Sequence, residues 1–392
     1  MKQPLWTKDF LLFISTNFFI ALNFYLLITT MSLFAIEQFA ASSSAAGLAS
    51  SIFVLGALLA RLVAGSCVEK IGRRKMLYSG LVLFLAASLL YFFSSSLVLL
   101  FSIRFIHGIA FGIANTAINT TIMDSLPAER RGEGTGYFSL SGTAATAIGP
   151  FLGIWLMNHY SMNAIFVFTS VVAVVALVFA LLAKVKEANL TTEERQAITF
   201  SLKPDRIFSF EVLPIAFLTL CLGIGYSSIM SFVNVYAIEL NLIEAASYFF
   251  IVYAIFLFGS RPIAGKILDA RGDNIVVLPS IIFFALSLLF MSIADNSFLL
   301  LVAAALAAMG FGTYTSSAQA IAAKLASKKE MGLAISTFFI GLDSGIGIGP
   351  FLLGLIIPYT GYQNMYLALS LFVLCLTGLY YVIHGRKPIA KK

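Results

Sequence analysis

Two apolar segments of this sequence contain ionisable side chains that could carry a proton or bind a solute. Asp343 lies about twelve residues inside the segment 332–357, and it is the one of the 18 acidic residues that lies so deep in an apolar segment. A carboxylate buried there can take up and release a proton. Asp343 is therefore the candidate proton carrier, with a structural salt bridge and a contact to a cationic solute as alternatives.

The segment 97–123 carries a stripe of functional side chains at steps of three or four residues, which places them on one helical face. The stripe consists of Arg104, His107, Phe111, Asn115 and Asn119. A charged residue inside a membrane span costs about 2.5 to 3.5 kcal/mol, so Arg104 is expected to face protein or water. Two interpretations follow, a surface that contacts a solute or a buried network of hydrogen bonds between helices.

Other polar and aromatic side chains in the apolar segments are weaker candidates for solute contacts. They are Asn17, Asn23, Tyr25, Tyr226, Asn234, Tyr314 and Gln319. With 37 Phe and 15 Tyr in the chain and few charges in the apolar segments, a binding cavity would be apolar and aromatic. Such a cavity favours an amphipathic or lipophilic compound.

Several kinds of site are missing from the sequence. The three histidines, His107, His159 and His384, are scattered, and no HExxH motif occurs, so we expect no metal site. The phosphate-binding pattern GxxxxGK[ST] is also absent, which excludes a pump driven by ATP. We therefore expect no cofactor, no enzymatic activity and no nucleic-acid partner.

The composition predicts which elements hold these residues. Hydrophobic residues make up 60% of the 392 residues and charged residues 11%, with a mean hydropathy of +0.96, which is typical of a membrane protein. We predict an all-α fold with twelve membrane spans at 10–36, 46–68, 76–95, 97–123, 134–157, 162–184, 210–237, 246–268, 275–294, 298–324, 332–357 and 364–384.

Positive charge alternates along the chain. Lys and Arg gather in every second loop and at both termini, whereas the remaining loops contain neither residue. Because positively charged loops stay in the cytoplasm during insertion, both termini are expected there, in a multi-pass protein of the cell membrane.

The sequence repeats itself after 200 positions. The pentapeptide IGPFL at 148–152 returns at 348–352, and Arg61 and Gly72 align with Arg261 and Gly272. We therefore predict a six-span half at 1–184, a cytoplasmic linker at 185–209 and a second half at 210–392. Two parallel repeats of this kind enclose a cavity between them, and rocking them would open it to one side at a time.

Three motifs make the chain similar to a known family. GSCVEKIGRRK (65–75), RFIHGIAFG (104–112) and AIGPFLG (147–153) resemble motifs of the major facilitator superfamily, the last one those of its twelve-helix drug:proton antiporters. The resemblance implies a monomeric secondary transporter in the lipid bilayer that exports a small molecule in exchange for protons. A transporter of one metabolite, such as a sugar or a siderophore-like compound, is the alternative, followed by a membrane-embedded enzyme or a receptor.

The resemblance also implies a role for particular residues in coupling and gating. Span 46–68 would lie beside span 332–357, so Arg61 would pair with Asp343 in one conformation, and Arg104 would take part in coupling. The residues of the expected conformational gate are Gly65, Glu69, Gly72, Arg73, Asp124, Gly149, Pro150, Gly265, Asp269, Gly349 and Pro350. The Gly-Pro pairs would kink their helices and shape surfaces that slide during transport.

Overall fold

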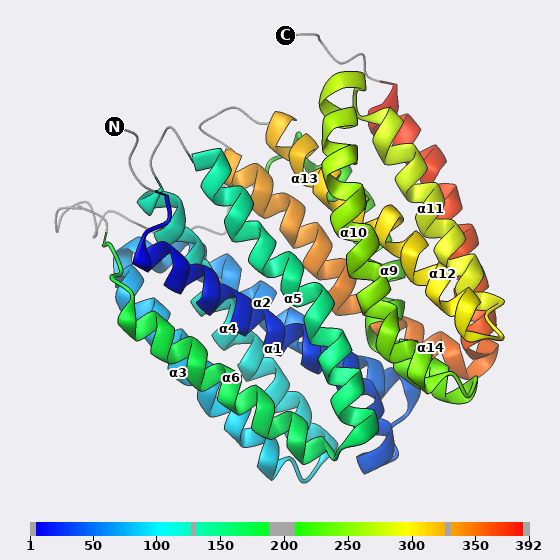
Figure 1. The fold of residues 1–392 in the computed structure, drawn as a ribbon, viewed down its shortest axis with the longest axis horizontal. Helices are drawn as coiled ribbons and strands as arrows, with labels where there is room; N and C mark the ends of the chain where they lie inside the picture. The colour runs from blue at the N-terminus through cyan, green and yellow to red at the C-terminus, as the bar shows by residue number, and fades with distance from the viewer. Residues whose placement is uncertain (1–4, 127–130, 188–207, 326–330, 387–392) are drawn as a thin grey trace. The chain divides into compact units, whose positions relative to one another are not determined.

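The structure, a computed structural model, describes residues 5–126, 131–187, 208–325 and 331–386. Within these ranges the protein is helical, and eleven helices are long and apolar enough to cross a membrane (Figure 1). The last of them, α14 (Met331–Tyr380), contains two predicted spans and is broken at Gly361, whose φ is 70°. The predicted all-α fold with twelve spans is therefore confirmed.

The helices follow the predicted spans closely. The first six are α1 (Lys8–Phe39), α2 (Ser43–Ile71), α3 (Arg73–Leu90), α4 (Leu97–Ser125), α5 (Arg131–His159) and α6 (Met162–Leu182). After the linker come α9 (Leu213–Glu239), α10 (Ile243–Arg271), α11 (Asn274–Ser292), α12 (Ser297–Ala307), α13 (Thr313–Leu325) and α14. Short turns of other helical types are η1 (Tyr91–Phe93), η3 (Ala308–Gly312) and η4 (Tyr381–Gly385).

The repeat is visible in the local geometry of helix starts. Gly72 precedes α3 with φ 102° and Gly272 precedes α11 with φ 90°, a backbone conformation that side chains with a Cβ disfavour. Ser96 Oγ accepts a hydrogen bond from the N–H of Leu99, and Asn296 Oδ1 accepts one from the N–H of Leu299. Both pairs lie 200 positions apart, so the duplicated sequence forms the same turns and caps twice.

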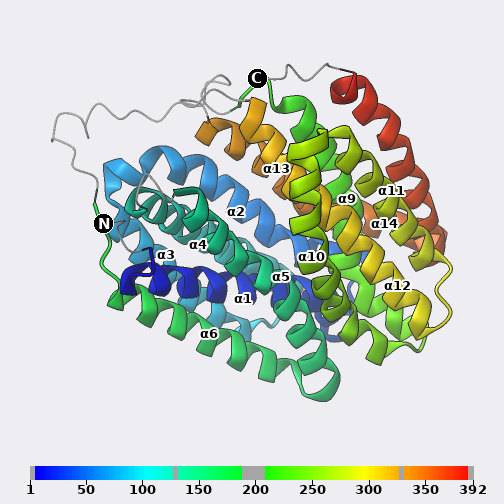
Figure 2. The same ribbon diagram turned by 45° about the horizontal axis from the view of Figure 1, so that its top comes forward.

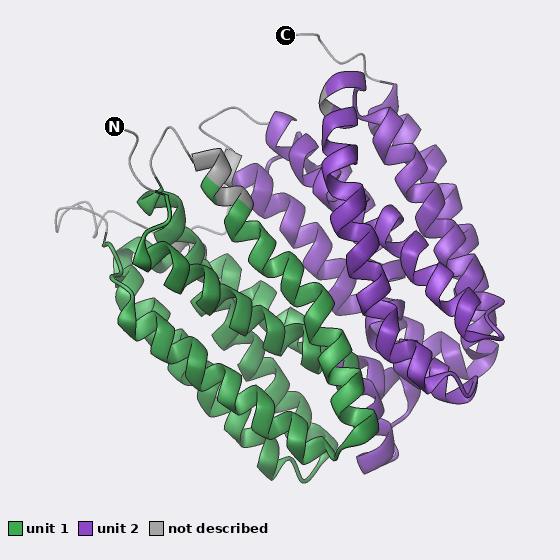
Figure 3. Ribbon diagram, viewed as in Figure 1, with its two compact units in different colours: residues 1–30, 52–201 green, residues 31–51, 202–392 purple. Residues whose placement is uncertain are grey.

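Contacts divide the chain into two compact units (Figure 3). Unit 1 comprises residues 1–30 and 52–201, and unit 2 comprises residues 31–51 and 202–392. The start of α2 thus belongs with unit 2. The predicted halves, 1–184 and 210–392, rest on the sequence repeat and stay a prediction, and most of the predicted linker lies outside the described residues.

Small residues allow the helices of unit 1 to pack closely. In α3, Gly80 lies against the backbone of Ala114 in α4, and in α4, Gly108 lies against the carbonyl of Phe53 in α2. α3 also packs along α6 (Figures 1 and 2). Any side chain larger than hydrogen at the two glycines would push these backbones apart.

Unit 2 is organised around α14. Before the break, Gly341, Gly345 and Gly349 lie against α9. After the break, α14 runs beside α11 (Figure 2), and Ser370 Oγ donates a hydrogen bond to the carbonyl of Ala285. Gly354 lies against the backbone of Ser43, so the start of α2 also packs on α14.

The predicted span 298–324 is not one regular helix. Between α12 and α13 the five residues of η3 form a π-helical turn. Thr313 Oγ1 bonds to the carbonyl of Ala308 at 3.4 Å and to Ser260 Oγ in α10 at 3.0 Å. The counterpart in unit 1, α4, has no such turn, so this irregularity is specific to unit 2.

Candidate functional site

Arg104 and His107 lie in the interior of unit 1, and neither side chain is exposed. Tyr91 of η1, directly after α3, joins them, because its hydroxyl lies 2.9 Å from His107 Nδ1 and 3.5 Å from Arg104 Nη1. Ser88 Oγ gives its hydrogen to the carbonyl of Phe84, so it can only accept from His107 Nε2, 3.4 Å away. Nδ1 of the neutral imidazole then accepts the hydrogen of Tyr91.

Arg104, His107, Tyr91 and Ser88 form the Arg104 cluster, a buried hydrogen-bond network between α4 and the α3–η1 segment. Such a network is one of the two arrangements that the sequence left open. Its residues face other helices rather than open space in this structure. A part for Arg104 in proton coupling, or for His107 in solute binding, stays a prediction.

Aromatic rings surround this cluster. Phe53 of α2 stacks on Phe24 of α1, with ring centres 5.1 Å apart. The guanidinium of Arg104 lies over the Phe53 ring, 4.9 Å from its centre. Phe111 lies 5.7 Å from Phe24, with the guanidinium of Arg61 5.9 Å from its centre. Two cations thus rest on one group of phenylalanines, where their attraction to the ring faces offsets part of the cost of burial.

Three predicted asparagines form one chain of hydrogen bonds. Asn119 Nδ2 donates to Asn115 Oδ1 at 3.2 Å, and Asn115 Nδ2 donates to Asn17 Oδ1 at 3.0 Å. Asn17 Nδ2 donates to Ser141 Oγ at 2.8 Å, and Ser141 donates to the carbonyl of Phe138 at 2.6 Å. This amide chain links α4, α1 and α5. Asn115 and Asn119 are half-buried, so part of it is accessible.

The other predicted residues of α1 contact α5 and α6 of unit 1. Asn23 is buried and donates to the carbonyl of Thr169 in α6 at 2.9 Å. Tyr25 is half-buried, and its Cβ would lie 2.8 Å from a Cβ placed on Gly149. Gly149 and Gly153 of α5 both meet the backbone of α1, so this contact lies within one unit.

Most predicted residues of unit 2 are buried as well. Tyr226 stacks on Phe311 with ring centres 4.1 Å apart, and the hydroxyl of Tyr314 lies 2.9 Å from Thr219 Oγ1. Asn234 is fully buried and Gln319 is half-buried. Their role in solute binding stays a prediction.

Asp343 is half-buried in α14, two residues after Gly341, which places it on another face of the helix than the Gly341–Gly345–Gly349 row. Arg61 belongs to unit 1 and Asp343 to unit 2. The predicted pairing of these two side chains, and the proton-carrier role of Asp343, stay predictions.

Glu69, Arg73 and Asp124 meet at one end of unit 1, as the family resemblance implied. Arg73 Nε donates to Glu69 Oε1 at 2.9 Å, and Nη1 donates to Asp124 Oδ2 at 2.8 Å and to the carbonyl of Lys186 at 3.2 Å. Only 6% of the Arg73 side chain is exposed, so the guanidinium is enclosed by its partners. Glu187, a residue that the sequence did not point to, completes this group.

The remaining predicted gate residues lie apart from that group. Gly349 and Pro350 belong to α14, where Gly349 meets Ser227 of α9, and Pro150 lies within α5. A Cβ on Gly265 would meet nothing within 4 Å. Gly65 and the side chain of Asp269 lie outside what the structure describes.

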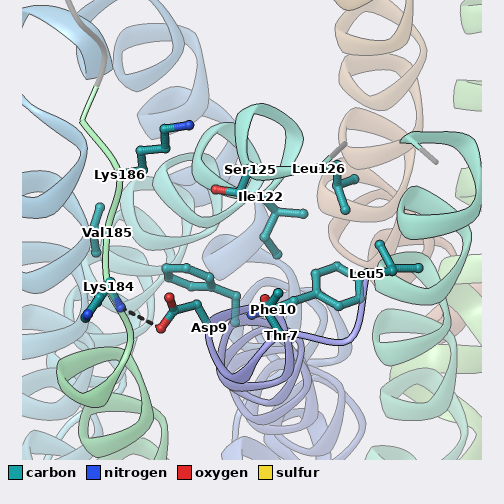
Figure 4. A pocket seen from close by; sticks show the side chains of 11 residues that line it. Leu5, Thr7, Asp9, Phe10, Ile122, Ser125, Leu126, Lys184, Val185 and Lys186 are labelled. Carbon is teal, nitrogen blue, oxygen red and sulfur yellow. Dashed lines mark hydrogen bonds between the residues drawn. The ribbon is translucent and has the colours of Figure 1, made fainter. Parts of the chain in front are cut away.

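A cavity of about 400 Å³ opens between the start of α1, the end of α4 and the segment after α6 (Figure 4). Phe10, Phe13 and Ile122 form apolar walls, while Asp9 and Lys186 provide charge. Asp9 Oδ1 accepts the backbone N–H of Lys184 at 3.0 Å. None of the residues predicted to bind a solute lines this cavity.

Sequence reasoning missed Tyr91, Phe53, Ser141 and Glu187. A tyrosine between apolar residues at the end of a span is a signal that could have indicated Tyr91, because a buried hydroxyl needs a partner. Each of the other three contacts a predicted residue in the structure but lies far from it in the sequence. Only the fold brings them together.

Comparisons with known proteins identify the family of this chain. The family described as the Major Facilitator Superfamily matches residues 13–278 and 215–392. The staphylopine export protein of Staphylococcus aureus is 25% identical over 351 residues, which cover 85% of this chain and 86% of that protein. Multidrug resistance protein MdtG of Escherichia fergusonii is 24% identical over 338 residues, covering 84% and 81%.

A similar fold occurs among solved structures. The crystal structure of a POT family transporter in complex with 5-aminolevulinic acid superposes with a TM-score of 0.80 and covers 96% of both chains. The two sequences are 16% identical, so this likeness concerns the fold alone.

Proposed function

Because this chain belongs to the major facilitator superfamily, a family of membrane transporters, we propose that it is a proton-coupled exporter of small amphipathic or lipophilic compounds. It resembles the drug:proton antiporter branch of that family. We further propose that it works as a monomer in the cell membrane, with both termini in the cytoplasm and the proton gradient as its energy source.

The observation that carries this proposal is the match over most of the chain to proteins named for export and multidrug resistance. The position of Asp343 supports the coupling, since a carboxylate in a membrane span is costly and is usually found where it has a function. The absence of Lys and Arg from alternate loops supports the orientation.

In this mechanism, the compound enters from the cytoplasm and contacts the accessible part of the amide chain around Asn115 and Asn119. A proton taken up by Asp343 from the other side neutralises the carboxylate and weakens its attraction for Arg61. Neutralisation then favours the conformation in which the two residues lie apart. The Glu69–Arg73–Asp124 group stabilises one of the two conformations at the cytoplasmic end.

Proteoliposomes with an imposed pH gradient test the function. Purified protein is screened with a panel of lipophilic dyes and small metabolites, first with an acidic and then with an alkaline interior. An exporter that exchanges protons accumulates its compound against the gradient in only one of the two arrangements. Equal transport in both arrangements, at a rate that does not depend on the pH gradient, would contradict proton coupling.

Asp343→Asn tests the proton carrier. The variant should keep compound binding and exchange between equal concentrations, but lose accumulation driven by the pH gradient, because the amide cannot release a proton. Asp295→Asn, at an exposed position outside the helices, is the matched control and should behave as the unmodified protein. Undiminished gradient-driven transport in Asp343→Asn would exclude the carrier role, and loss of folded protein would indicate a structural salt bridge.

A transporter of one defined metabolite is the second candidate. The amide chain supports it, because amide groups whose directions are fixed by their neighbours suit a solute with a defined set of polar groups. The same screen separates the two functions. Transport of several unrelated lipophilic dyes favours the first, and transport of one polar metabolite alone favours the second.

A further inference from the structure

The first turn of α3 is held by a side chain from the segment after α6, which lies far away in the sequence. Glu187 Oε2 accepts the backbone N–H of Arg73 and Oε1 accepts that of Arg74, both at 3.0 Å. Gly72, which precedes the helix, has no side chain to accept them. The first N–H groups of a helix lack partners within the helix, and a negative charge there also interacts favourably with the helix dipole. Glu187 thus performs the task of an N-cap residue from 114 residues away.

The same segment also holds the side chain of Arg73. The carbonyl of Lys186, one residue before Glu187, accepts from Arg73 Nη1 at 3.2 Å. Arg73 is therefore fixed at its backbone by Glu187 and at its guanidinium by Glu69, Asp124 and this carbonyl. Its partners come from α2, α4 and the segment after α6, so Arg73 is the residue at which three parts of unit 1 meet.

The arrangement is tight and rich in negative charge. Three carboxylates face one guanidinium and one helix N-terminus, and Glu69 Oε2 has no hydrogen-bond partner among the described residues. The side chain of Arg73 is almost entirely enclosed, whereas that of Asp124 is 49% exposed. Arg73 is the first residue of α3, so a rotation of the first turn of this helix would move the guanidinium relative to Asp124.

Unit 2 joins the two corresponding elements, the start of α11 and the segment after its last helix, with different side chains. At the start of α11, Asp273 Oδ2 lies 3.1 Å from His384 Nε2, and Asn274 Nδ2 donates to the carbonyl of Gly385 at 2.9 Å. Asp273 and Asn274 stand 200 positions after Arg73 and Arg74. The acid lies on the helix start in unit 2 and after the last helix in unit 1. The two corresponding elements are therefore joined in both units, with the acidic side chain on opposite partners, so the contact recurs although its residues differ.

We propose that Glu187 is a positioning residue of the cytoplasmic gate. It fixes the first turn of α3, and through it the guanidinium of Arg73 between Glu69 and Asp124. The segment that leaves unit 1 toward the second repeat is thereby attached to the gate. This inference rests on the proposed function, because the Glu69–Arg73–Asp124 group has a gating role only in a transporter.

The native thiol Cys67 provides a readout that needs no transported compound. It lies in α2 two residues before Glu69, is partly exposed, and is one of three cysteines in the chain. With Cys221 and Cys375 replaced by serine, Cys67 is the single site for N-ethylmaleimide. Loss of a helix cap costs about 1 kcal/mol, which corresponds to a change of about fivefold in an equilibrium. Glu187→Gln should therefore raise the labelling rate of Cys67 about fivefold.

Transport in the same variant should fall about fivefold in maximal rate, with little change in KM, since the binding residues are untouched. Glu187→Asp, which keeps the charge, should restore much of the rate. Two matched controls should behave as the parent protein. Lys186→Gln keeps the carbonyl that binds Arg73, and Glu211→Gln removes a charge from an exposed position after the linker.

A second background decides whether Glu187 acts through Arg73. In Arg73→Ala the guanidinium is gone but the backbone N–H remains, so adding Glu187→Gln should change the labelling of Cys67 no further. An additive increase, or normal labelling and transport in folded Glu187→Gln and Glu187→Ala, would overturn the proposal. If labelling changes as expected while no compound is transported, the proposed function fails and the positioning of Arg73 stands.

Discussion

At the scale of single residues, the two repeats differ at the Arg104 cluster. The positions 200 residues after Tyr91, Arg104 and His107 hold Met291, Ala304 and Ala307, all buried. The polar cluster of unit 1 thus corresponds to apolar packing in unit 2. Unit 2 forms the corresponding helices without such a cluster, so the architecture does not require it. The free-energy cost of burying these polar groups in unit 1 must be offset by the hydrogen bonds among them, or the cluster is kept for a function.

Tyr91→Phe tests how far hydrogen bonds stabilise this cluster. The ring can keep its stacking on Phe166, whose centre lies 5.4 Å away, while His107 Nδ1 loses its partner. A buried polar atom without a partner costs about 1 to 3 kcal/mol, so the melting temperature in detergent should fall. Tyr137→Phe is the control, because its ring packs on Trp6 and its side chain is exposed. Equal melting temperatures for both variants would show that the hydroxyl of Tyr91 contributes nothing.

At the scale of helices, the Gly-Pro motifs are packing motifs within each unit. Gly149 lies against α1 in unit 1, and Gly349 lies against α9 in unit 2. The five identical letters therefore form the same kind of contact in both repeats. A sliding role during transport stays a prediction that a stability measurement can separate from static packing.

Gly149→Ala should destabilise the protein, and Gly142→Ala should not. A Cβ on Gly149 would lie 3.0 Å from Leu22 O and from Leu26 N, whereas one on Gly142, in the same helix, would meet nothing within 4 Å. Forcing a methyl group into a filled contact costs about 1 to 3 kcal/mol, while Ala in an open helical position gains up to about 1 kcal/mol. Thermal unfolding of the two purified variants gives the comparison. A normal melting temperature with lost transport in Gly149→Ala would favour the sliding role.

The sequence predicted elements better than contacts. Spans and helix starts follow from apolar length and from residues such as Gly72, since both are local properties. The stripe on α4 was placed on one face, but a helical period does not reveal which neighbour that face meets, so the burial of His107 was open. The π turn at η3 was also missed: Thr313, the residue after this turn, bonds to Ser260 of another helix, a contact that a pattern within one segment does not show. Glu187 was missed for the same reason.

At the scale of the whole molecule, the orientation in the membrane is the property that the charge pattern predicts. Ser43, Ser95 and Asn296 lie in, or at the ends of, predicted loops without Lys or Arg, so cysteines at these positions should react with an impermeant thiol reagent in intact cells. All three positions are exposed or border exposed residues in the structure. Lys186→Cys, in a protein without its native cysteines, should react only after the membrane is opened. The reverse pattern would invert the orientation.

The amide chain of unit 1 has a direction. The carbonyl of Phe138 can only accept, which forces Ser141 to donate to it and every amide before it to point its NH₂ group the same way. At the α4 end, Asn119 Nδ2 is also committed, to the carbonyl of Asn115 at 2.7 Å. The end of the chain is then Asn119 Oδ1, an acceptor. A solute that meets it gains a hydrogen bond when it carries an N–H or O–H, whereas an ether oxygen in that place would face it lone pair against lone pair.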